Sequence, residues 1–416
     1  MASTLSLASK SLLNRRATAL LNVLSIAVSV ALLSAVERVR TDAQTSFSNT
    51  ISGTDLILGA RSGELNLLLY SVFRIGSPTN SISWAGFREI ASRKEVDWTI
   101  PLSLGDAHRG FRVVGTNSDY FVHYKYAGDR TLEFASGKGF TAASDAVIGA
   151  EVAATLGYAV GDSIVVSHGL GDVSFVTHDD NPFSVSGILA PTGTPVDRSV
   201  HVSLEGIDLM HDIEVPDGDV SNSSYAPKDI TAALVGLKSR VAIFSLQRFV
   251  DEYETEALMA VIPGVALQQL WGLIGVAETA LFGVSAMVVL AGVLGLLTTL
   301  LVSLNERRRE MAVLRSVGAR PAHVFLLLLT EAAMLGLAGG LSGLALVQTA
   351  VIAARSWAQN EYGIQLAVGF RSFDLYILLG IVVLAVVTSC IPAWRAYRNS
   401  LADGLTVRLG GGVYEV

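Results

Sequence analysis

The stretch "ERRREMAVLRSVGARPAH" (residues 306–323) places five charged residues in a row directly after an almost uncharged segment, 273–304. About 20 apolar residues are enough to cross a bilayer, and charged residues mark the point where a span ends. The composition agrees, because 51% of the 416 residues are hydrophobic and only 16% are charged, whereas soluble domains are about 25% charged. The chain is therefore predicted to be an integral membrane protein.

Four segments are long and apolar enough to span a membrane, and the charged stretch separates the second from the third. The first could be read as a signal peptide, because basic residues precede it. Its apolar run is longer than a signal peptide needs, however, and no convincing cleavage site follows. We therefore expect a retained anchor. The predicted spans are 17–36, 273–304, 324–354 and 375–391.

Basic residues on the connecting segments predict the orientation of the spans. The two tails and the charged stretch together hold eleven Lys and Arg residues against four acids, whereas the long segment after the first span holds 29 acids against 17 bases. The tails and the charged stretch are therefore expected in the cytoplasm. The cytoplasmic parts are 1–16, 305–323 and 392–416, and the extracytoplasmic parts are 37–272 and the short loop 355–374.

The segment 37–272 is long enough to form a core of its own. Apolar patterning predicts strands at 183–189 and 229–239. One helix is expected to end at Gly157, and another is expected at 240–258. The predicted fold class is an α-helical membrane protein with four transmembrane helices in a 1+3 arrangement and a large α+β domain between the first two.

Residues 261–282 connect this domain to the second span and are apolar at nearly every helical position. A continuous helix running from the membrane into the domain would explain the pattern, and it would carry movement between the two. A plain linker is the alternative.

Within the charged stretch, apolar residues are spaced as on one face of a helix, because Met311, Leu314 and Val317 are three positions apart. Gly318 suits a left-handed C-terminal cap, and Pro321 prevents continuation. The pattern indicates an amphipathic helix at the cytoplasmic membrane surface. On composition alone, the arginines could serve only to set the topology of the neighbouring spans.

The same residues resemble the signature of the FtsX/MacB/LolC-type permeases, the type VII ABC transporters. Family members carry Glu-Arg-x-x-Glu-x-x-x-Leu-x-x-x-Gly-Ala between their second and third spans, and this pattern runs here from Glu306 to Ala319. The segment 389–405 resembles the family's Pro-Ala-x-x-Ala ending, although Asn399-Ser400 stands where a proline is usual. The start of the first span and two stretches of the domain are similar as well, so the likeness covers nearly the whole chain.

In that family the charged helix is a coupling helix that lies in a groove of a cytoplasmic ATPase, and the resemblance implies the same role here. The chain has no P-loop, because the nearest lookalike, at 136–139, lacks the spacing and the Ser or Thr. Unlike MacB itself, the chain is therefore expected to use a separate ATPase subunit that holds ATP and Mg, and to bind no cofactor of its own. The implied coupling residues are Glu306, Arg307, Arg308, Arg309, Glu310, Met311, Leu314, Arg315 and Gly318.

The third span holds one acid and several small residues. Glu331 is costly in lipid and matches a glutamate of the family, which implies a structural or coupling role, and snorkelling to the cytoplasmic surface is the alternative. Two overlapping Gly-x-x-x-Gly motifs would let helices approach closely. We expect them to pack against the second or fourth span, with a dimer seam as the alternative. The glycines are Gly336, Gly339, Gly340 and Gly343.

Six of the seven histidines lie in the segment 37–272 without the tight spacing of a zinc site. The most metal-like cluster is His178-Asp179-Asp180. Solvated loops are nevertheless expected for these histidines, and no metal site is predicted.

The segment 54–80 is unusually apolar for an exposed domain. Its leucines, Val72 and Phe73 are expected to fill the core of the domain. A cargo surface or an interface with a second subunit is the alternative.

The resemblance to this family implies that the chain is the permease subunit of an ATP-driven ABC transporter. The resemblance implies mechanotransmission, in which ATP hydrolysis moves the extracytoplasmic domain to export, extract or release a substrate. An FtsX-like signalling subunit that activates an extracytoplasmic hydrolase is the alternative. No catalytic residue and no nucleic-acid partner is expected, and the sequence identifies no substrate-binding residue. The expected setting is the inner membrane, with its lipid, a separate ATPase, a second permease copy or paralogue, and a periplasmic adaptor or substrate-binding protein as partners.

Overall fold

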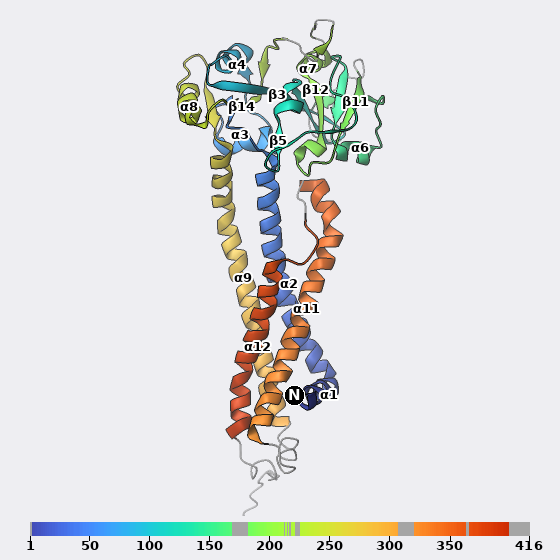
Figure 1. The fold of residues 1–416 in the computed structure, drawn as a ribbon, viewed down its shortest axis with the longest axis vertical. Coiled ribbons are helices and arrows are strands. Elements are labelled where there is room, and N and C mark those ends of the chain that lie inside the picture. The colour runs from blue at the N-terminus through green and yellow to red at the C-terminus, as the bar shows by residue number, and fades with distance from the viewer. Residues whose placement is uncertain are drawn as a thin grey trace, which may run out of the picture. The chain divides into compact units, whose positions relative to one another are not determined.

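The fold is that of a computed structural model, shown in Figure 1, whose contacts divide the chain into two compact units. The membrane unit comprises residues 1–40, 276–356 and 366–416, and the domain comprises 41–275 and 357–365. The structure describes residues 2–168, 182–211, 213, 215, 218–220, 225–306, 320–362 and 366–398.

The membrane unit is built from α-helices, and four helices of the described chain are long and apolar enough to cross a membrane (Figure 1). Each of the four predicted spans falls inside one of them. A fifth, shorter helix precedes the first. The helices are α1 (Ala2–Asn14), α2 (Arg16–Thr50), α9 (Pro263–Glu306), α11 (Pro321–Tyr362) and α12 (Ser372–Arg398).

Helices α2 and α9 each contribute residues to both units. The predicted helix at 261–282 is confirmed, because α9 is one element from Pro263 to Glu306. Its start suits proline, whose missing N–H would be unpaired in the first turn in any case. The segment is therefore not a plain linker.

The domain contains an 11-stranded mixed sheet among its described residues. The strand order is β15-β1-β14-β3-β4-β12-β8-β11-β7, with β10 paired to β3 and β9 to β11. All neighbours are antiparallel except β12 with β4 and β11 with β8. The strands are β1 (Leu56–Ala60), β3 (Val96–His108), β4 (Phe111–Thr116), β7 (Phe134–Gly137), β8 (Asp145–Ile148), β9 (Ser163–Ile164), β10 (Ser167–His168), β11 (Phe183–Leu189), β12 (Ser199–Ser203), β14 (Ala232–Leu237) and β15 (Leu258–Val261).

Strand β3 joins the two halves of this sheet. Its first part pairs with β14 and its second part with β4, and the register to β4 shifts between Leu104 and Ala107. Two short ribbons complete the strands. They pair β2 (Ile82–Ser83) with β13 (Asp229–Ile230), and β5 (Lys125–Tyr126) with β6 (Arg130–Thr131).

Short helices pack on the sheet, and two of them begin at serine caps. Ser83 Oγ accepts a hydrogen bond from Gly86 N at the start of α4, and Ser203 Oγ accepts one from Gly206 N at the start of α7. These caps fix where the two helices leave the strands before them. The α-helices are α3 (Glu64–Ser71), α4 (Trp84–Ala91), α5 (Asp119–His123), α6 (Ala150–Leu156), α7 (Leu204–Met210) and α8 (Ile243–Asp251), and the 3-10 turns are η1 (Pro195–Arg198) and η3 (Arg240–Ala242).

The core of the domain consists of three apolar clusters on the two faces of the sheet. Successive residues of a strand point to opposite faces. Ile57 accordingly belongs to the largest cluster and Leu58 to the second, while Val147 belongs to the largest and Ile148 to the third. Burial on both faces explains why these strands are continuously apolar.

Two predictions for the domain are confirmed without change. Strand β11 has the predicted bounds, 183–189. Helix α6 ends at Leu156, and Gly157 forms its C-cap with a left-handed φ of 73°, a conformation that glycine adopts without strain.

Two other predictions need correction. The predicted strand at 229–239 is divided into β13 and β14, because Thr231 turns aside and both its N–H and its hydroxyl donate to Leu102 O. The predicted helix at 240–258 ends at Asp251, and β15 follows at Leu258. Asp251 Oδ1 accepts a hydrogen bond from Ala260 N at 3.1 Å, which favours the return of the chain as an edge strand.

The apolar segment 54–80 belongs to the core of the domain. It forms β1 and α3, and Leu67, Leu68, Val72 and Phe73 are buried in the largest apolar cluster. Its apolar composition is therefore explained by folding.

Candidate functional site

The predicted coupling helix falls outside the described part of the chain. Helix α9 ends at Glu306 and α11 begins at Pro321, and the predicted residues Arg307 to Gly318 lie between them, beyond the described residues. The two flanking helices place both ends of this stretch at helix termini. The proposed coupling role stays a prediction.

The four glycines of the third span divide between two neighbouring helices. A Cβ built at Gly336 would lie 3.1 Å from Ala385 Cβ of α12, and one at Gly340 would lie 2.6 Å from Leu378 Cδ1 of the same helix. These two glycines therefore allow α11 to approach α12 more closely than an alanine could. For these two glycines, the prediction of packing against the second or fourth span is confirmed, and the neighbour is the fourth.

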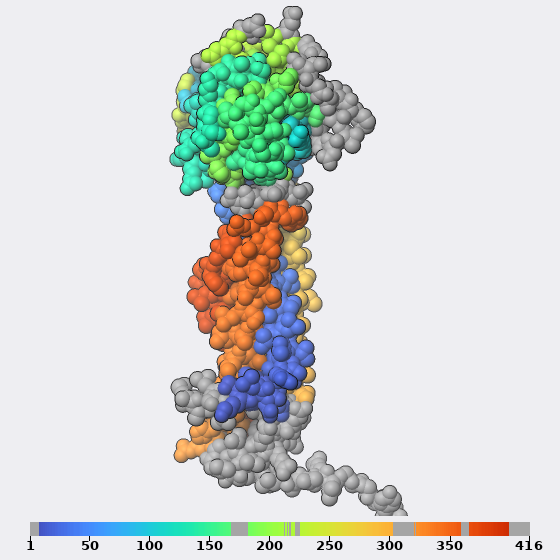
Figure 2. Space-filling view, turned by 90° about the vertical axis from the view of Figure 1, so that its right-hand side faces the viewer, coloured from blue at the N-terminus to red at the C-terminus, as the bar shows by residue number. Residues whose placement is uncertain are grey.

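The other two glycines pack against the first span. A Cβ built at Gly339 would lie 2.6 Å from Ile26 Cβ, and one at Gly343 would lie 2.6 Å from Ala27 O, both on α2. Figure 2 shows α11, in orange, directly against α2, in blue. The contact of these two glycines with the first span was not predicted. The two motifs are offset by three residues, which rotates the second by about 60° around the helix and turns it toward a different neighbour.

Glu331 lies inside the bundle, with 3% of its surface exposed. It lines a cavity of about 230 Å³ together with Arg15, Asn22 and Thr298, so residues of α2, α9 and α11 meet there. Asn22 is itself buried and donates through Nδ2 to Thr18 O. The carboxylate therefore occupies a polar interior site and does not extend to an open surface, as snorkelling would require.

Small polar residues also line the contact between α2 and α9. The Ser29 hydroxyl lies 2.8 Å from Ser25 O in its own helix and 3.1 Å from Val288 O on α9, and it can donate to either. Gly292 of α9 faces it, since a Cβ there would lie 3.0 Å from Ser29 Oγ. Close approach and hydrogen bonds of this kind hold helices together in lipid, where apolar contact alone gives no preference for protein over lipid.

A buried ion pair that the sequence did not indicate joins α2 to the N-terminal end of α12. The side chains of Arg38 and Asp374 are each 3% exposed, and Arg38 Nη2 lies 2.5 Å from Asp374 Oδ2. Ser34 donates to Asp374 Oδ1 at 3.0 Å, and Arg38 donates to Gly369 O at 2.9 Å. Both carboxylate oxygens of Asp374 therefore have partners.

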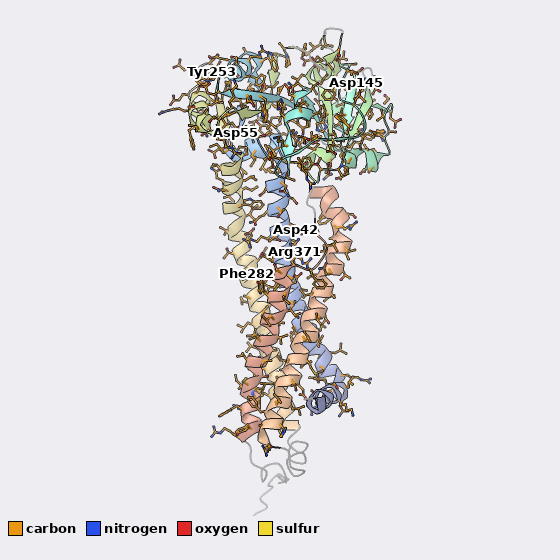
Figure 3. The ribbon with its side chains drawn as sticks, in the orientation of Figure 1. Asp42, Asp55, Asp145, Tyr253, Phe282 and Arg371 are labelled. Atoms are coloured by element: carbon orange, nitrogen blue, oxygen red, sulfur yellow. The ribbon has the colours of Figure 1, made fainter. Side chains whose placement is uncertain are left out.

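Asp374 also caps the helix on which it lies. It occupies the third position of α12, and its Oδ2 accepts a hydrogen bond from the backbone N–H of Arg371 at 2.9 Å. Figure 3 labels Arg371 beside this end of α12. Gln348 of α11 holds the preceding turn from the other side, because its Nε2 donates to Gly369 O at 2.6 Å. Three of the four long helices thus meet at this point. In the sequence, the signal that could have indicated this pair is the position of Arg38 just after the first apolar run and of Asp374 just before the fourth.

A second ion pair, between Arg40 of α2 and Glu278 of α9, is more open to solvent. Arg40 Nε lies 3.0 Å from Glu278 Oε2, and their side chains are 42% and 22% exposed. Glu37 also contacts Arg40, at 3.2 Å. Glu278 is the only charge predicted inside the second span, and this pair explains how it is accommodated.

The prediction of solvated loops for the histidines is wrong for His108 and His201, which are 3% and 0% exposed. His108 Nδ1 donates to Val165 O, and burial lowers the pKa of its imidazole. His201 packs against Tyr120 and is likewise kept neutral by burial, with its pKa lowered to about 3. A neutral imidazole behaves as a small aromatic group, so a core strand can hold it.

The cluster at His178 lies outside the described residues. Among the residues that are described, no three His, Cys, Asp or Glu side chains are placed to hold a metal ion.

Four long apolar helices, seams of small residues between them and a large α+β domain in one loop define a membrane protein of the permease type. The sequence profile of the MacB-like periplasmic core domain matches residues 19–248, and that of the FtsX-like permease C-terminal region matches residues 282–401. The first match alone covers more than half of the chain. The chain belongs to the FtsX-like ABC transporter permeases that carry a MacB-like periplasmic core domain.

Named relatives include two-part proteins that are longer than this chain. It is 27% identical over 244 residues to the macrolide export ATP-binding/permease protein MacB of Nitrobacter winogradskyi. This match covers 54% of the chain and 34% of that protein. It is 25% identical over 355 residues to the pyoverdine export ATP-binding/permease protein PvdT of Pseudomonas syringae pv. tomato. This match covers 79% of the chain and 49% of that protein. The chain thus spans a third to a half of the length of these relatives.

Among solved structures, the periplasmic region of MacB from Actinobacillus actinomycetemcomitans is similar to this chain with a TM-score of 0.34 and 11% identity. The similarity covers 53% of the chain and 94% of that structure.

Proposed function

We propose that the chain is the permease subunit of an ATP-driven ABC transporter that works by mechanotransmission. ATP and Mg would bind to a separate cytoplasmic subunit, whose movement would act on the coupling stretch 306–319. The observation that carries the proposal is the continuity of α2 and α9, unbroken helices of 35 and 44 residues that each contribute to both units. Because an α-helix is stiff along its axis, displacement at one end would reach the other.

Polar contacts support a joint movement of these two helices. The Ser29 hydroxyl faces a carbonyl of α9, and Arg40 pairs with Glu278. The buried pair of Arg38 and Asp374 adds α12 to the same assembly. Displacement of one helix would therefore move its neighbours with it.

The direction of transport is proposed from the relatives, whose names describe export of a macrolide or of pyoverdine. We assign this chain to the export, extraction or release of a substrate by movement of its domain. It would lie in the inner membrane with both termini in the cytoplasm, beside a second permease copy or a paralogue. A periplasmic adaptor or substrate-binding protein would act next to the domain.

The first test is co-purification of the intact tagged chain from its own cells in detergent. Wild type is expected to retain an ABC ATPase, and the double variant Glu310→Arg/Leu314→Asp is expected to lose it, because the variant reverses one charge and removes one apolar contact. Glu254→Arg, at an exposed position of the domain, is the control and is expected to retain the ATPase. Retention by the double variant contradicts the coupling role.

The second arm uses that complex to test helix continuity. Val276 of α9 is 76% exposed, so Val276→Pro removes little packing and chiefly breaks the helix, at a cost of about 3 kcal/mol. The variant is expected to keep the ATPase and to lose ATP-dependent protection of the domain from protease, whereas Val276→Ala is expected to keep both. Equal ATP-dependent protection in all three proteins contradicts mechanotransmission. Recovery of an extracytoplasmic hydrolase, with no cargo, favours the signalling alternative.

A further inference from the structure

A cavity of about 450 Å³ lies in the domain, lined by residues of α4, β3 and α7 (the α4–α7 cavity). Figure 1 shows α4 and α7 along the same upper side of the sheet, with β3 between them. The volume is within the range of sites that hold small molecules, about 300–1,000 Å³. None of the features described for the membrane unit involves this cavity.

One wall of the cavity carries a buried carboxylate without a partner. Glu205, the second residue of α7, is 6% exposed and lines the cavity. Its carboxylate accepts no hydrogen bond and forms no ion pair within the described part of the chain. A carboxylate in such a place is unfavourable unless a group of opposite charge or a set of donors compensates it.

A second carboxylate, that of Asp119, also lines the cavity. Its Oδ2 accepts a hydrogen bond from Asn117 Nδ2 at 2.9 Å.

Aromatic side chains form much of the remaining wall. Trp84 and Phe87 of α4 have ring centroids 4.9 Å apart, and Tyr225 lines the cavity with them. The Tyr225 hydroxyl cannot serve Glu205, because it already donates to Asp208 Oδ2 at 2.6 Å. Of the described lining residues only Arg88 of α4 is cationic, and it is exposed. Two lining residues, Asp119 and Glu205, carry carboxylates, so negative charge is in excess.

An unpaired carboxylate, excess negative charge and aromatic faces together suit a ligand that is cationic at one end and apolar at the other. Ammonium and guanidinium groups supply only donors, and aromatic faces attract cations. We propose that the α4–α7 cavity binds the ammonium or guanidinium group of an organic cation. Glu205 accepts its hydrogens, and Trp84 and Phe87 pack against the carbon atoms attached to it.

This proposal rests on the proposed function to the extent that it gives the transported or recognised molecule a basic group. Binding itself needs neither ATP nor the ATPase. The cavity can therefore be tested on the full-length chain alone, reconstituted in lipid nanodiscs. Failure of cation binding would leave the coupling experiment unaffected, and loss of ATPase binding would leave cation binding unaffected.

The experiment is isothermal titration with tryptamine, an indole that carries a primary ammonium group, and with tryptophol, in which a neutral hydroxyl replaces that group. Wild type is expected to bind tryptamine at least about tenfold more tightly than tryptophol. Glu205→Gln is expected to remove that difference by weakening tryptamine alone. Glu254→Gln, a charge-matched change at an exposed position, is expected to change neither.

A thermal melt separates a binding defect from misfolding. Glu205→Gln has almost the same volume and removes an unpaired buried charge, so its melting temperature is expected to equal or exceed that of wild type. The proposal is overturned if tryptamine does not bind, if both compounds bind equally, or if Glu205→Gln leaves tryptamine binding unchanged.

Discussion

The membrane unit and the domain hold their interiors together in different ways. The interior of the domain consists of large apolar side chains in three clusters, and its buried histidines are neutral. The membrane unit also buries apolar clusters between its helices, but it adds glycines at the contacts of α11 and a buried charge pair between Arg38 and Asp374. The difference follows from the solvent, because water drives apolar side chains together whereas lipid is as apolar as they are.

The comparison teaches which kind of substitution each unit tolerates. In the domain, the buried histidines are accommodated by losing their charge, and their effect depends on pH. In the membrane unit, helices associate through close approach and through polar groups that satisfy one another. A change of one methyl group or one charge should therefore matter more at the helix contacts than it does on an exposed surface.

The largest effect is expected when the buried ion pair loses one partner. Arg38→Met leaves the Asp374 carboxylate buried with an unbalanced charge, which costs about 3–5 kcal/mol of unfolding free energy. Unfolding in SDS, followed by circular dichroism, measures this loss. The double variant Arg38→Met/Asp374→Asn removes both charges and is expected to be more stable than Arg38→Met alone.

The exposed pair in the same unit is the control. Arg40 is 42% exposed, so Arg40→Met is expected to cost less than about 1 kcal/mol although it also removes an ion pair. Equal losses for Arg38→Met and Arg40→Met would show that burial does not distinguish the two pairs.

The next effect is expected at the contact of α11 with α2. A Cβ at Gly343 would lie 2.6 Å from Ala27 O and 2.8 Å from Val30 Cβ, so Gly343→Ala must move the helices apart at a cost of about 1–3 kcal/mol. At Gly380 of α12, nothing lies within 4 Å of a built Cβ. Gly380→Ala is therefore expected to be neutral or to stabilise, since alanine is the better helix former.

The same variant tests the alternative of a dimer seam. SDS unfolding reports the stability of the subunit, and light scattering in detergent reports its association. Loss of association with unchanged subunit stability in Gly343→Ala would contradict the packing of this glycine within one chain.

The sequence was sufficient for features that depend on neighbours along the chain. The four spans follow from runs of apolar residues, and the end of α6 follows from the left-handed preference of Gly157. The continuity of α9 follows from a pattern that is apolar at nearly every helical position between 261 and 282. Each of these signals lies within the element that it predicts.

Features that depend on pairing in space were missed or only half predicted. Two Gly-x-x-x-Gly motifs predict close approach, but nothing in the motif identifies the neighbouring helix, and the contact of Gly339 and Gly343 with α2 was not predicted. Arg38 and Asp374 are 336 positions apart, so no local pattern links them. Likewise, Glu205 becomes conspicuous only once its place in the α4–α7 cavity is known.

The smallest effect is expected from pH in the domain. Burial lowers the pKa of His201 to about 3, whereas an unfolded histidine titrates near 6.5. Its Nδ1 donates a hydrogen bond to Val147 O. Its Nε2 is buried, and no described atom could accept a hydrogen bond from it if it were protonated. Below pH 6.5 the unfolded chain therefore binds a proton that the folded domain does not, and stability falls with pH until about pH 3.

Between pH 7 and pH 5.5 this single group is expected to remove about 1 kcal/mol of stability from the domain. His201→Phe keeps the aromatic contact with Tyr120, which has a ring-centroid distance of 4.9 Å in wild type, and removes the titration. Thermal unfolding followed by near-ultraviolet circular dichroism at both pH values is expected to show a smaller shift in the variant than in wild type. The control is His123→Phe. His123 is partly exposed and stacks on Trp98, and phenylalanine keeps a ring at that position, so this variant should retain the wild-type shift. An equal shift in all three proteins would mean that His201 is not the group that makes the domain sensitive to acid.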